Sequence, residues 1–293
     1  MINIRLLNKR FVKKLVLTLP FAILNLFGIL INRALQIFKN QQSNLWIDYM
    51  YKKSREKFFQ VSHTSQEKKV QLEIFTPNNM TEYRARTFST KEPDTLDWLD
   101  RHSDEKVLLD IGANVGLYTL YFGKIGRRVV ALECSPLNIG ELVRNINLNN
   151  LQDQVTVIPI ALSSGEEMGE FFMGSEELGA AESSFGNETG FDGNGMRTIN
   201  RFTTISMSLD ELYALYPNLD KPNLMKIDVD GNESAILEGA SRLLDNNKLV
   251  SVLCEVNPNS HSRNEKVASI LSSRGFGLER QQTGNNQIWN RNL

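Results

Sequence analysis

A short apolar segment that ends in an acid and runs into a glycine-rich turn constrains the fold more than any other part of the chain. Residues 107–116 read Val-Leu-Leu-Asp-Ile-Gly-Ala-Asn-Val-Gly. Gly112 and Gly116 lack a Cβ, so a ligand can approach the backbone closely, and Asn114 tolerates a left-handed conformation. The dinucleotide fingerprint has three spaced glycines, which this segment lacks. The segment therefore predicts a buried strand ending at Asp110, a turn that cradles a nucleotide-like ligand, and a helix.

A second apolar segment, residues 128–133, also ends in an acid, Glu133. In a parallel nucleotide-binding sheet, an acid at the tip of the second strand, about twenty residues past the glycine turn, can accept the ribose hydroxyls. Ser135 and Pro136 follow as the predicted N-cap and first residue of a helix. Alone, either acid could simply cap a helix or pair with a lysine. Together with the glycine turn, Asp110 and Glu133 indicate a cofactor site.

Strand and helix patterns alternate along most of the chain from residue 106 onward. Such alternation predicts right-handed crossovers and a parallel sheet, and therefore an α/β fold. A strand at 70–75 and a helix beginning at Pro93 precede this part. The predicted strands are 106–110, 128–133, 154–161, 223–229 and 249–256, the predicted helices are 115–125, 136–149, 231–244 and 262–274, and residues 276–281 and 286–290 could form a terminal hairpin.

Residues 163–200 interrupt the alternation, because they are rich in Gly, Ser, Glu and Asn and contain one strand-like piece, 170–173. A long irregular segment inside a compact domain is usually functional or mobile, so we predict an insertion here. The core resumes with a strand at 203–207 and a capping box at Ser208–Glu211 that begins a short helix. Residues 42–65 are polar and helix-compatible, as expected of a connector.

A second acidic cluster follows the strand predicted at 223–229. Asp228, Asp230 and Glu233 come at its carboxyl end, where ligands bind in open α/β sheets. Carboxylates there could position a hydroxyl, take its proton or hold a divalent cation. Glu233 could equally complement a helix dipole, and Asp230 could belong to a turn. Glu255 ends the next strand, and His261 follows it. His261 could assist deprotonation, although a loop histidine is more often solvated.

Composition excludes several classes of function. The formal net charge of -1 gives no basic bias toward nucleic acid. The only cysteines, Cys134 and Cys254, each end a predicted buried strand, so we expect reduced thiols rather than a disulfide framework. No Gly-x-Ser-x-Gly, His-Glu-x-x-His or phosphate-loop motif occurs, which argues against α/β-hydrolases, zinc proteases and P-loop NTPases. We predict no metal site.

The amino terminus differs from the rest. An apolar run at 15–31 follows Arg5, Lys9, Arg10, Lys13 and Lys14. As a membrane span it is short and is interrupted by Pro20 and Asn25, and as a signal peptide it lacks a good cleavage site. It could also be an interfacial helix on anionic lipid, or a helix that docks on the domain or on a second subunit. We predict an N-terminal extension over 1–65, a domain over 66–293, and a cytoplasmic protein whose residues 1–40 contact the membrane surface.

Several separate segments between about residues 70 and 280 together resemble one known family. The segments are 86–99, Leu-Asp-Ile-Gly-Ala-Asn-Val-Gly-Leu-Tyr at 109–118, Leu-Glu-Cys-Ser-Pro at 132–136, 145–149, 160–163, and Lys-Ile-Asp-Val-Asp-Gly-Asn-Glu at 226–233. In this order they resemble the FkbM methyltransferases. The resemblance implies a class I S-adenosylmethionine-dependent fold, with a seven-stranded, mostly parallel sheet, one reversed strand and helices on both faces. It also implies O-methylation of hydroxyls on sugars, glycolipids or natural products.

The resemblance also implies roles for individual residues. The glycine turn would line the methionine part of S-adenosylmethionine, and Glu133 would bind its ribose. Ala161 and Leu162 would flank its adenine. Asp228 would lie near the transferred methyl group. Asp230 departs from the family, which often has glutamate there. The expected cofactor-binding residues are Asp110, Gly112, Asn114, Gly116, Glu133, Ser135, Ala161, Leu162 and Asp228, and the expected catalytic residues are Asp228, Asp230, Glu233 and His261.

Three other classes of function compete with this interpretation. A nicotinamide oxidoreductase would use the same sheet, but the third glycine is missing. A membrane-tethered module could bind the cofactor without turnover. A nucleic-acid methyltransferase would need an Asn-Pro-Pro-Tyr-type base pocket or a basic face, and the sequence shows neither. We expect the acceptor to be a small molecule or a glycan.

Overall fold

The computed structural model describes residues 21–33, 45–65, 68–188, 190, 194–257, 259–279 and 285–292. These residues belong to two compact units, Met1–Glu56 and Lys57–Leu293. In the first unit, residues 21–33 are helical and α2 spans Leu45–Glu56. The basic residues before position 15 and the start of the apolar run lie outside the described residues. In the part of the chain that is described, no helix has both the length and the apolar character needed to cross a membrane.

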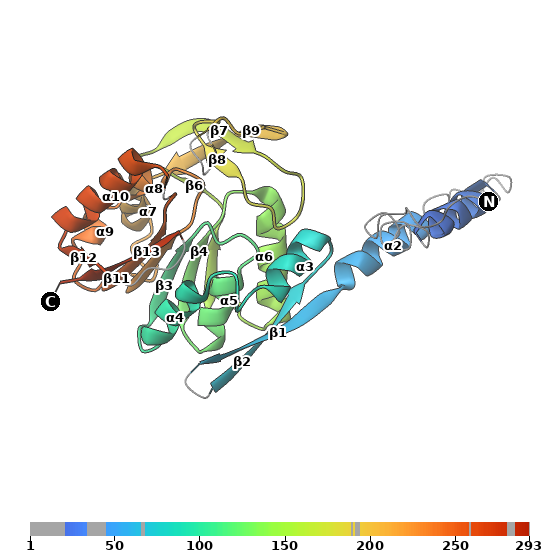
Figure 1. Ribbon diagram of the computed structural model, residues 1–293, viewed down its shortest axis with the longest axis horizontal. Helices are drawn as coiled ribbons and strands as arrows, with labels where there is room; N and C mark the ends of the chain where they lie inside the picture. The colour runs from blue at the N-terminus through green and yellow to red at the C-terminus, as the bar shows by residue number, and fades with distance from the viewer. Residues whose placement is uncertain are drawn as a thin grey trace, which may run out of the picture. The chain divides into compact units, whose positions relative to one another are not determined.

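A seven-stranded sheet forms the centre of the second unit (Figure 1). Strand β13 runs opposite to the other six strands, so the predicted sheet with one reversed strand is confirmed. The order across the sheet is β12 (Phe276–Leu278), β13 (Asn286–Arg291), β11 (Ser251–Glu255), β10 (Leu224–Ile227), β3 (Val107–Ile111), β4 (Arg128–Leu132) and β5 (Val155–Ile158).

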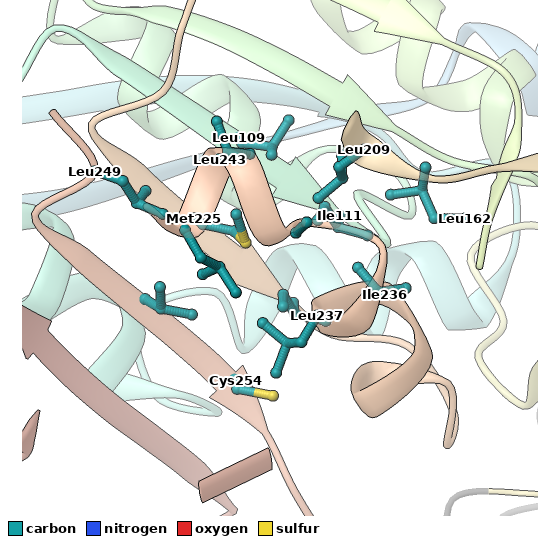
Figure 2. Packing of buried hydrophobic residues seen from close by; sticks show 14 of the residues in the cluster. Leu109, Ile111, Leu162, Leu209, Met225, Ile236, Leu237, Leu243, Leu249 and Cys254 are labelled. Carbon is teal, nitrogen blue, oxygen red and sulfur yellow. The ribbon is translucent and has the colours of Figure 1, made fainter. Parts of the chain in front are cut away.

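Helices cover both faces of this sheet. Successive residues of a strand point to opposite faces, so neighbouring residues contact different sets of helices. Leu108 packs with the helices α4 (Pro93–Arg101), α5 (Leu117–Lys124) and α6 (Pro136–Leu148). Leu109 packs with the helices of the other face, α7 (Leu209–Leu215), α8 (Glu233–Glu238), α9 (Ser241–Leu244) and α10 (His261–Ser273). Figure 2 shows part of this second cluster, in which Met225 and Cys254 of the sheet lie near Leu237 of α8.

One predicted helix, 231–244, is two helices in the structure. The helix is interrupted at Gly239, between α8 and α9. A Cβ at Gly239 would lie 2.6 Å from the Ser163 carbonyl oxygen and 2.8 Å from Ser208 Cβ. The break therefore lets the backbone pack closely against the chain that leads into and out of the insertion.

The beginning of the second unit differs from the prediction. Residues 58–65 form strand β1 (Phe58–Ser65), which pairs antiparallel with β2 (Lys68–Phe75), where a helix-compatible connector was expected. The compact unit that contains these strands spans Lys57–Leu293. A short helix, α3 (Asn79–Arg86), follows with a capping box at Asn78 and Thr81. No helix was predicted between the strand at 70–75 and the helix beginning at Pro93.

The predicted insertion is more regular than its composition suggests. It contributes to a four-stranded sheet of order β6-β9-β7-β8. Its strands pair across long stretches of sequence, as β6 does with β9, and such pairing leaves little local signal. The strands are β6 (Ala161–Leu162), β7 (Glu167–Met173), β8 (Ser183–Phe185) and β9 (Asn200–Met207).

Candidate active site

A cavity of about 400 Å³ lies at the carboxyl ends of the central parallel strands. Gly112 and Asn114 after β3 line it, as do Glu133 after β4, Asp228 after β10 and Glu255 at the end of β11. Side chains of the four-stranded sheet, including Phe171 and Phe185, complete the lining. Ligands of open α/β sheets bind at this edge, so the cavity occupies the place that the sequence predicted.

The glycine turn adopts a conformation that needs its particular residues. Gly112 has φ 79°, and a Cβ there would lie 1.9 Å from the carbonyl oxygen of Asp228. Asn114 has φ 52°, as its expected left-handed tolerance allows. Its side-chain amide donates a hydrogen bond to the Ala180 carbonyl oxygen, 2.9 Å away. The turn therefore contacts both the next strand end and the insertion. Gly116 is the N-cap of α5 and lies outside the cavity lining.

Glu133 is held by backbone groups. Its Oε2 accepts a hydrogen bond from Asn114 N at 2.8 Å, and its Oε1 accepts from Cys134 N at 2.9 Å and Ser135 N at 2.7 Å. Each carboxylate oxygen can accept two hydrogen bonds, so Oε2 retains capacity for a ligand hydroxyl. Burial outweighs these bonds and raises the pKa of Glu133. The Ser135 side chain makes no cap hydrogen bond and does not line the cavity, so Ser135 acts through its backbone N–H.

Asp110 lies behind the cavity rather than in its wall. It is 1% exposed, and its Oδ2 accepts a hydrogen bond from Thr119 Oγ1 at 2.5 Å. Its Oδ1 is buried without a hydrogen-bond partner among the described residues. Burial raises the pKa of Asp110, and the charge of Lys226 opposes that shift. Asp110 pairs in register with Lys226 on the neighbouring strand, so the two side chains share one face of the sheet.

Lys226 is a buried cation beneath the cavity. Its side chain is 2% exposed, and its Nζ lies 2.5 Å from Asp228 Oδ2 and 5.1 Å from the centre of the Tyr118 ring. Burial lowers the pKa of Lys226, but the carboxylates of Asp228, Asp110 and Glu92 outweigh burial and raise it overall. Lys226 is therefore charged at neutral pH.

Asp228 and Glu255 have opposite protonation states. Burial raises the pKa of Asp228, but Lys226 and a hydrogen bond with Glu255 outweigh burial and hold it well below its usual range. Burial and the neighbouring Asp228 carboxylate raise the pKa of Glu255 to about 9. At neutral pH, Asp228 is thus ionised and Glu255 is protonated.

The structure brings together some of the other predicted residues and separates the rest. Asp230 lines the cavity, and its Oδ2 accepts a hydrogen bond from Ser183 N at 3.0 Å, which holds the insertion. Ala161 and Leu162 also line it. Glu233 does not; its Oε1 accepts from Gly231 N at 2.9 Å, and burial raises its pKa to about 7. His261 is exposed at the start of α10 and is absent from the lining.

Two cationic side chains in the cavity wall were not predicted. Arg84 comes from α3, and Lys91 comes from the turn before α4. Arg84 is tied to the insertion through a hydrogen bond from its Nε to the Gly179 carbonyl oxygen. The unpredicted helix α3 explains why Arg84 was missed. In contrast, Lys226 carried a readable signal, since a lysine within the apolar strand Leu224–Ile227 requires a buried partner.

The seven-stranded sheet with one reversed strand and the cavity at its carboxyl edge are those expected of a class I methyltransferase fold. Residues 110–278 match the family described as "Methyltransferase FkbM domain". That match covers more than half of the chain, so the protein belongs to the FkbM methyltransferase family.

Individual relatives are distant. The protein named "Methyltransferase 1" from Beauveria bassiana is 25% identical over 201 residues, which cover 60% of this chain and 74% of the relative. An FkbM methyltransferase structure from Methylobacillus flagellatus KT has 18% identity and a TM-score of 0.43, with 64% of this chain and only 44% of that chain covered. An O-methyltransferase from Bacillus cereus in complex with SAH has 15% identity and a TM-score of 0.43, with 72% and 90% covered. The family assignment rests on the sequence match, since these TM-scores lie below 0.5.

The cofactor of a methyltransferase of this family is S-adenosylmethionine, and the cavity fits it. Its volume of about 400 Å³ falls in the range of about 300 to 1,000 Å³ typical of small-molecule sites. Glu133 Oε2 keeps an acceptor position at the tip of β4. Gly112 lines the cavity, and the absence of its Cβ makes room for the Asp228 carbonyl oxygen beside it. No group of three or more His, Cys, Asp or Glu side chains in the described part of the chain is arranged to hold a metal ion.

Proposed function

We propose that the protein O-methylates a hydroxyl group on a sugar, glycolipid or natural product. The observation that carries this proposal is the pair of carboxyl groups, Asp228 and Glu255, in the wall of the cofactor cavity. S-adenosylmethionine would supply a methyl group bonded to a positively charged sulfur. A hydroxyl oxygen can bond to that methyl carbon and displace the sulfur directly. Carboxyl groups suit a hydroxyl acceptor because they accept its hydrogen bond and orient its oxygen.

The two ends of the cavity take different parts in this reaction. Gly112, Asn114 and Glu133 bind the cofactor, while Ala161 and Leu162 form an apolar wall for its adenine. Asp110 and Ser135 support this end from behind, and Gly116 begins the helix that follows the turn.

Asp228 positions the acceptor hydroxyl. Because Lys226 keeps it ionised, Asp228 accepts a hydrogen bond well but is a weak base. Positioning of two reactants can contribute about 7 to 11 kcal/mol, whereas a general base contributes a factor of roughly 10² to 10⁴. Asp228 therefore acts mainly by alignment. Asp230 shapes the acceptor side through its hydrogen bond to Ser183.

The acceptor side of the cavity also contains cations and aromatic rings. Arg84 and Lys91 bring positive charge, and Phe171 and Phe185 bring flat apolar surfaces. Sugars present both hydroxyls and apolar ring faces, so this combination supports a glycan or glycolipid acceptor. The elements that supply these side chains are α3 with the turn before α4, and the four-stranded sheet.

The proposal includes contact between the N-terminal unit and a membrane surface in a cytoplasmic setting. The helix over residues 21–33 exposes large apolar side chains, among them Phe27 at 64% and Leu30 at 57%. The five basic residues of positions 5–14 precede it in the sequence. A full chain that sediments with anionic vesicles, but not after Phe27→Asp with Leu30→Asp, would support this contact. Equal sedimentation of both proteins would contradict it.

The function is tested by mass spectrometry of glycans and lipid-linked intermediates from cells with and without this chain. We expect a gain of one methyl group on one species when the active chain is present. In vitro, cofactor with a deuterated methyl group should transfer the label to the same species. Failure of transfer with every candidate, despite cofactor binding, would favour the alternative of a membrane-tethered binding module without turnover. Membership of a methyltransferase family argues against the alternative of a nicotinamide oxidoreductase.

A further inference from the structure

Two carboxyl groups from adjacent strands meet in the cofactor cavity. Ile227 of β10 pairs with Cys254 of β11 in parallel register, so the next residues along each strand, Asp228 and Glu255, are neighbours. Each of these carboxyl groups acts on the pKa of the other. Two carboxyl groups that share one site resist double ionisation, so one of them holds a proton.

The surroundings decide which carboxyl group holds that proton. Lys226 Nζ lies 2.5 Å from Asp228 Oδ2, which stabilises the ionised form of Asp228. The charge of Lys91 acts on Asp228 in the same direction. Glu255 has no such bond to a cation among those described, and the nearby acid Glu92 opposes its ionisation. The proton therefore resides on Glu255.

The charges around the pair are already unfavourable for another anion. The cations that act on it are Lys226 and Lys91, and the surrounding acids are Glu92, Asp110 and Asp230. Glu92 is bound by Lys91 Nζ at 3.0 Å and by Tyr118 Oη at 2.9 Å. Ionisation of Glu255 would add a further negative charge to this set. A cation in the same cavity would remove that obstacle.

We propose that Glu255 holds this proton in the cofactor-free protein, releases it when a sulfonium cation enters the cavity, and then accepts the proton of the acceptor hydroxyl. The inference rests on the proposed O-methylation. It assigns to Glu255 the base function that Asp228, bound to Lys226, performs poorly.

The proton balance closes over one catalytic cycle. Glu255 loses a proton to solvent as the cofactor binds. Glu255 then accepts the hydroxyl proton as the oxygen–carbon bond forms and the carbon–sulfur bond breaks, with the bonding pair left on a neutral sulfur. The protein ends the cycle with Glu255 protonated and Asp228 ionised, as it began. The one proton that each methylation produces reaches solvent at the next cofactor binding.

The size of the effect can be anticipated. The pKa of Glu255 is about 9 without cofactor. A close opposite charge lowers the pKa of a carboxyl group by about 1 to 3 units. With a shift of about two units, binding at pH 8 would release roughly 0.8 proton. Above about pH 10 the release should disappear, because Glu255 is already ionised there.

Calorimetric titration of the full chain at pH 8, in two buffers of different ionisation enthalpy, measures this release. S-adenosylhomocysteine is the matched ligand control, because it keeps the amino group of the cofactor but has a neutral sulfur. We expect roughly 0.8 more protons released with S-adenosylmethionine than with S-adenosylhomocysteine. Equal release with the two ligands would overturn the proposal.

Two protein variants locate the proton. Glu255→Gln should lose the difference between the ligands while still binding S-adenosylhomocysteine, which shows that the site is folded. Glu233→Gln is the matched control, since the pKa of Glu233 is raised to about 7 and it lies outside the cavity wall; its difference should persist. The assignment would be overturned if the difference in proton release between the two ligands persisted in Glu255→Gln or was lost in Glu233→Gln. Hydroxyl methylation is measured separately, so its failure is distinguishable from a failure of this proposal.

Discussion

The two sides of the cofactor cavity are held together in different ways. On the β3–β4 side, three backbone N–H groups fix the Glu133 carboxylate. On the β10–β11 side, side chains fix one another, through the ion pair of Lys226 with Asp228 and the proton of Glu255. A carboxylate held by backbone keeps its position when pH or a neighbour changes. A network of side-chain charges responds to both, so the first side suits binding and the second suits chemistry.

The largest expected effect comes from removal of the cation on the side-chain side. Lys226→Met leaves Asp228 without its buried partner, and such a loss typically costs about 3 to 5 kcal/mol. Chemical denaturation would measure the change in the free energy of unfolding. The double variant with Asp228→Asn should recover much of the loss, because it removes the unpaired charge. A loss below about 1 kcal/mol in the single variant would show that Lys226 does not hold this side together.

The backbone-held side is tested by Glu133→Gln, which removes the charge and one acceptor oxygen but keeps the shape. Hydrogen bonds to charged groups contribute about 1.5 to 3 kcal/mol, so the affinity for S-adenosylmethionine should fall about 10- to 100-fold. Calorimetry measures that affinity. Asp210→Asn is the control. The Asp210 carboxylate also accepts a hydrogen bond from a backbone group, Arg242 N, but it lies outside the cavity, so this substitution should leave the affinity unchanged. Unchanged affinity in Glu133→Gln would remove Glu133 from the cofactor site.

The two sides should also differ in their response to pH. Glu255 is protonated in the free protein below its pKa of about 9 and, by our proposal, ionised in the complex. Binding then releases a proton, so affinity for S-adenosylmethionine should rise with pH and level off above about pH 9. The rise should be at most about tenfold per pH unit. Affinity for S-adenosylhomocysteine should show no such rise, because its neutral sulfur does not ionise Glu255. The same dependence of affinity on pH for the two ligands would contradict the proposal.

The smallest effect is expected where the insertion meets the core. Asp230→Asn keeps an oxygen that can accept from Ser183 N but removes the charge. The expected loss is about 1 kcal/mol or less in the free energy of unfolding, since one hydrogen bond is weakened rather than broken. Methylation kinetics should show a change in KM for the acceptor and little change in kcat. A large fall in kcat would place Asp230 in the chemical step instead.

The β3–β4 side of the cavity could be predicted from sequence because its signals are local. The glycine turn, the acid at the end of β4 and Pro136 at the start of α6 lie within one stretch of chain. The side-chain side was only partly predictable. Asp228 was identified, but the protonation of Glu255 depends on the register of β10 against β11, which no local pattern encodes.

The N-terminal part of the domain and the insertion were hardest to predict. β1 pairs antiparallel with β2, but its sequence is polar enough to resemble a connector. β6 pairs with β9 some forty residues later, with two other strands between them. Arg84 and Phe185 reach the cavity only through such elements. His261 and Glu233 had favourable residue types and positions, but the packing of α8 and α10 keeps them out of the cavity wall.

A crystal structure of the full chain with S-adenosylhomocysteine tests the central claim most directly. The account predicts the ribose at Glu133, with a hydroxyl in hydrogen-bond contact with Oε2, and the sulfur on the side of the cavity lined by Asp228 and Glu255. Ligand bound outside this cavity, or with its ribose at Asp228 and its sulfur toward Glu133, would contradict the division of the site into a binding side and a chemical side.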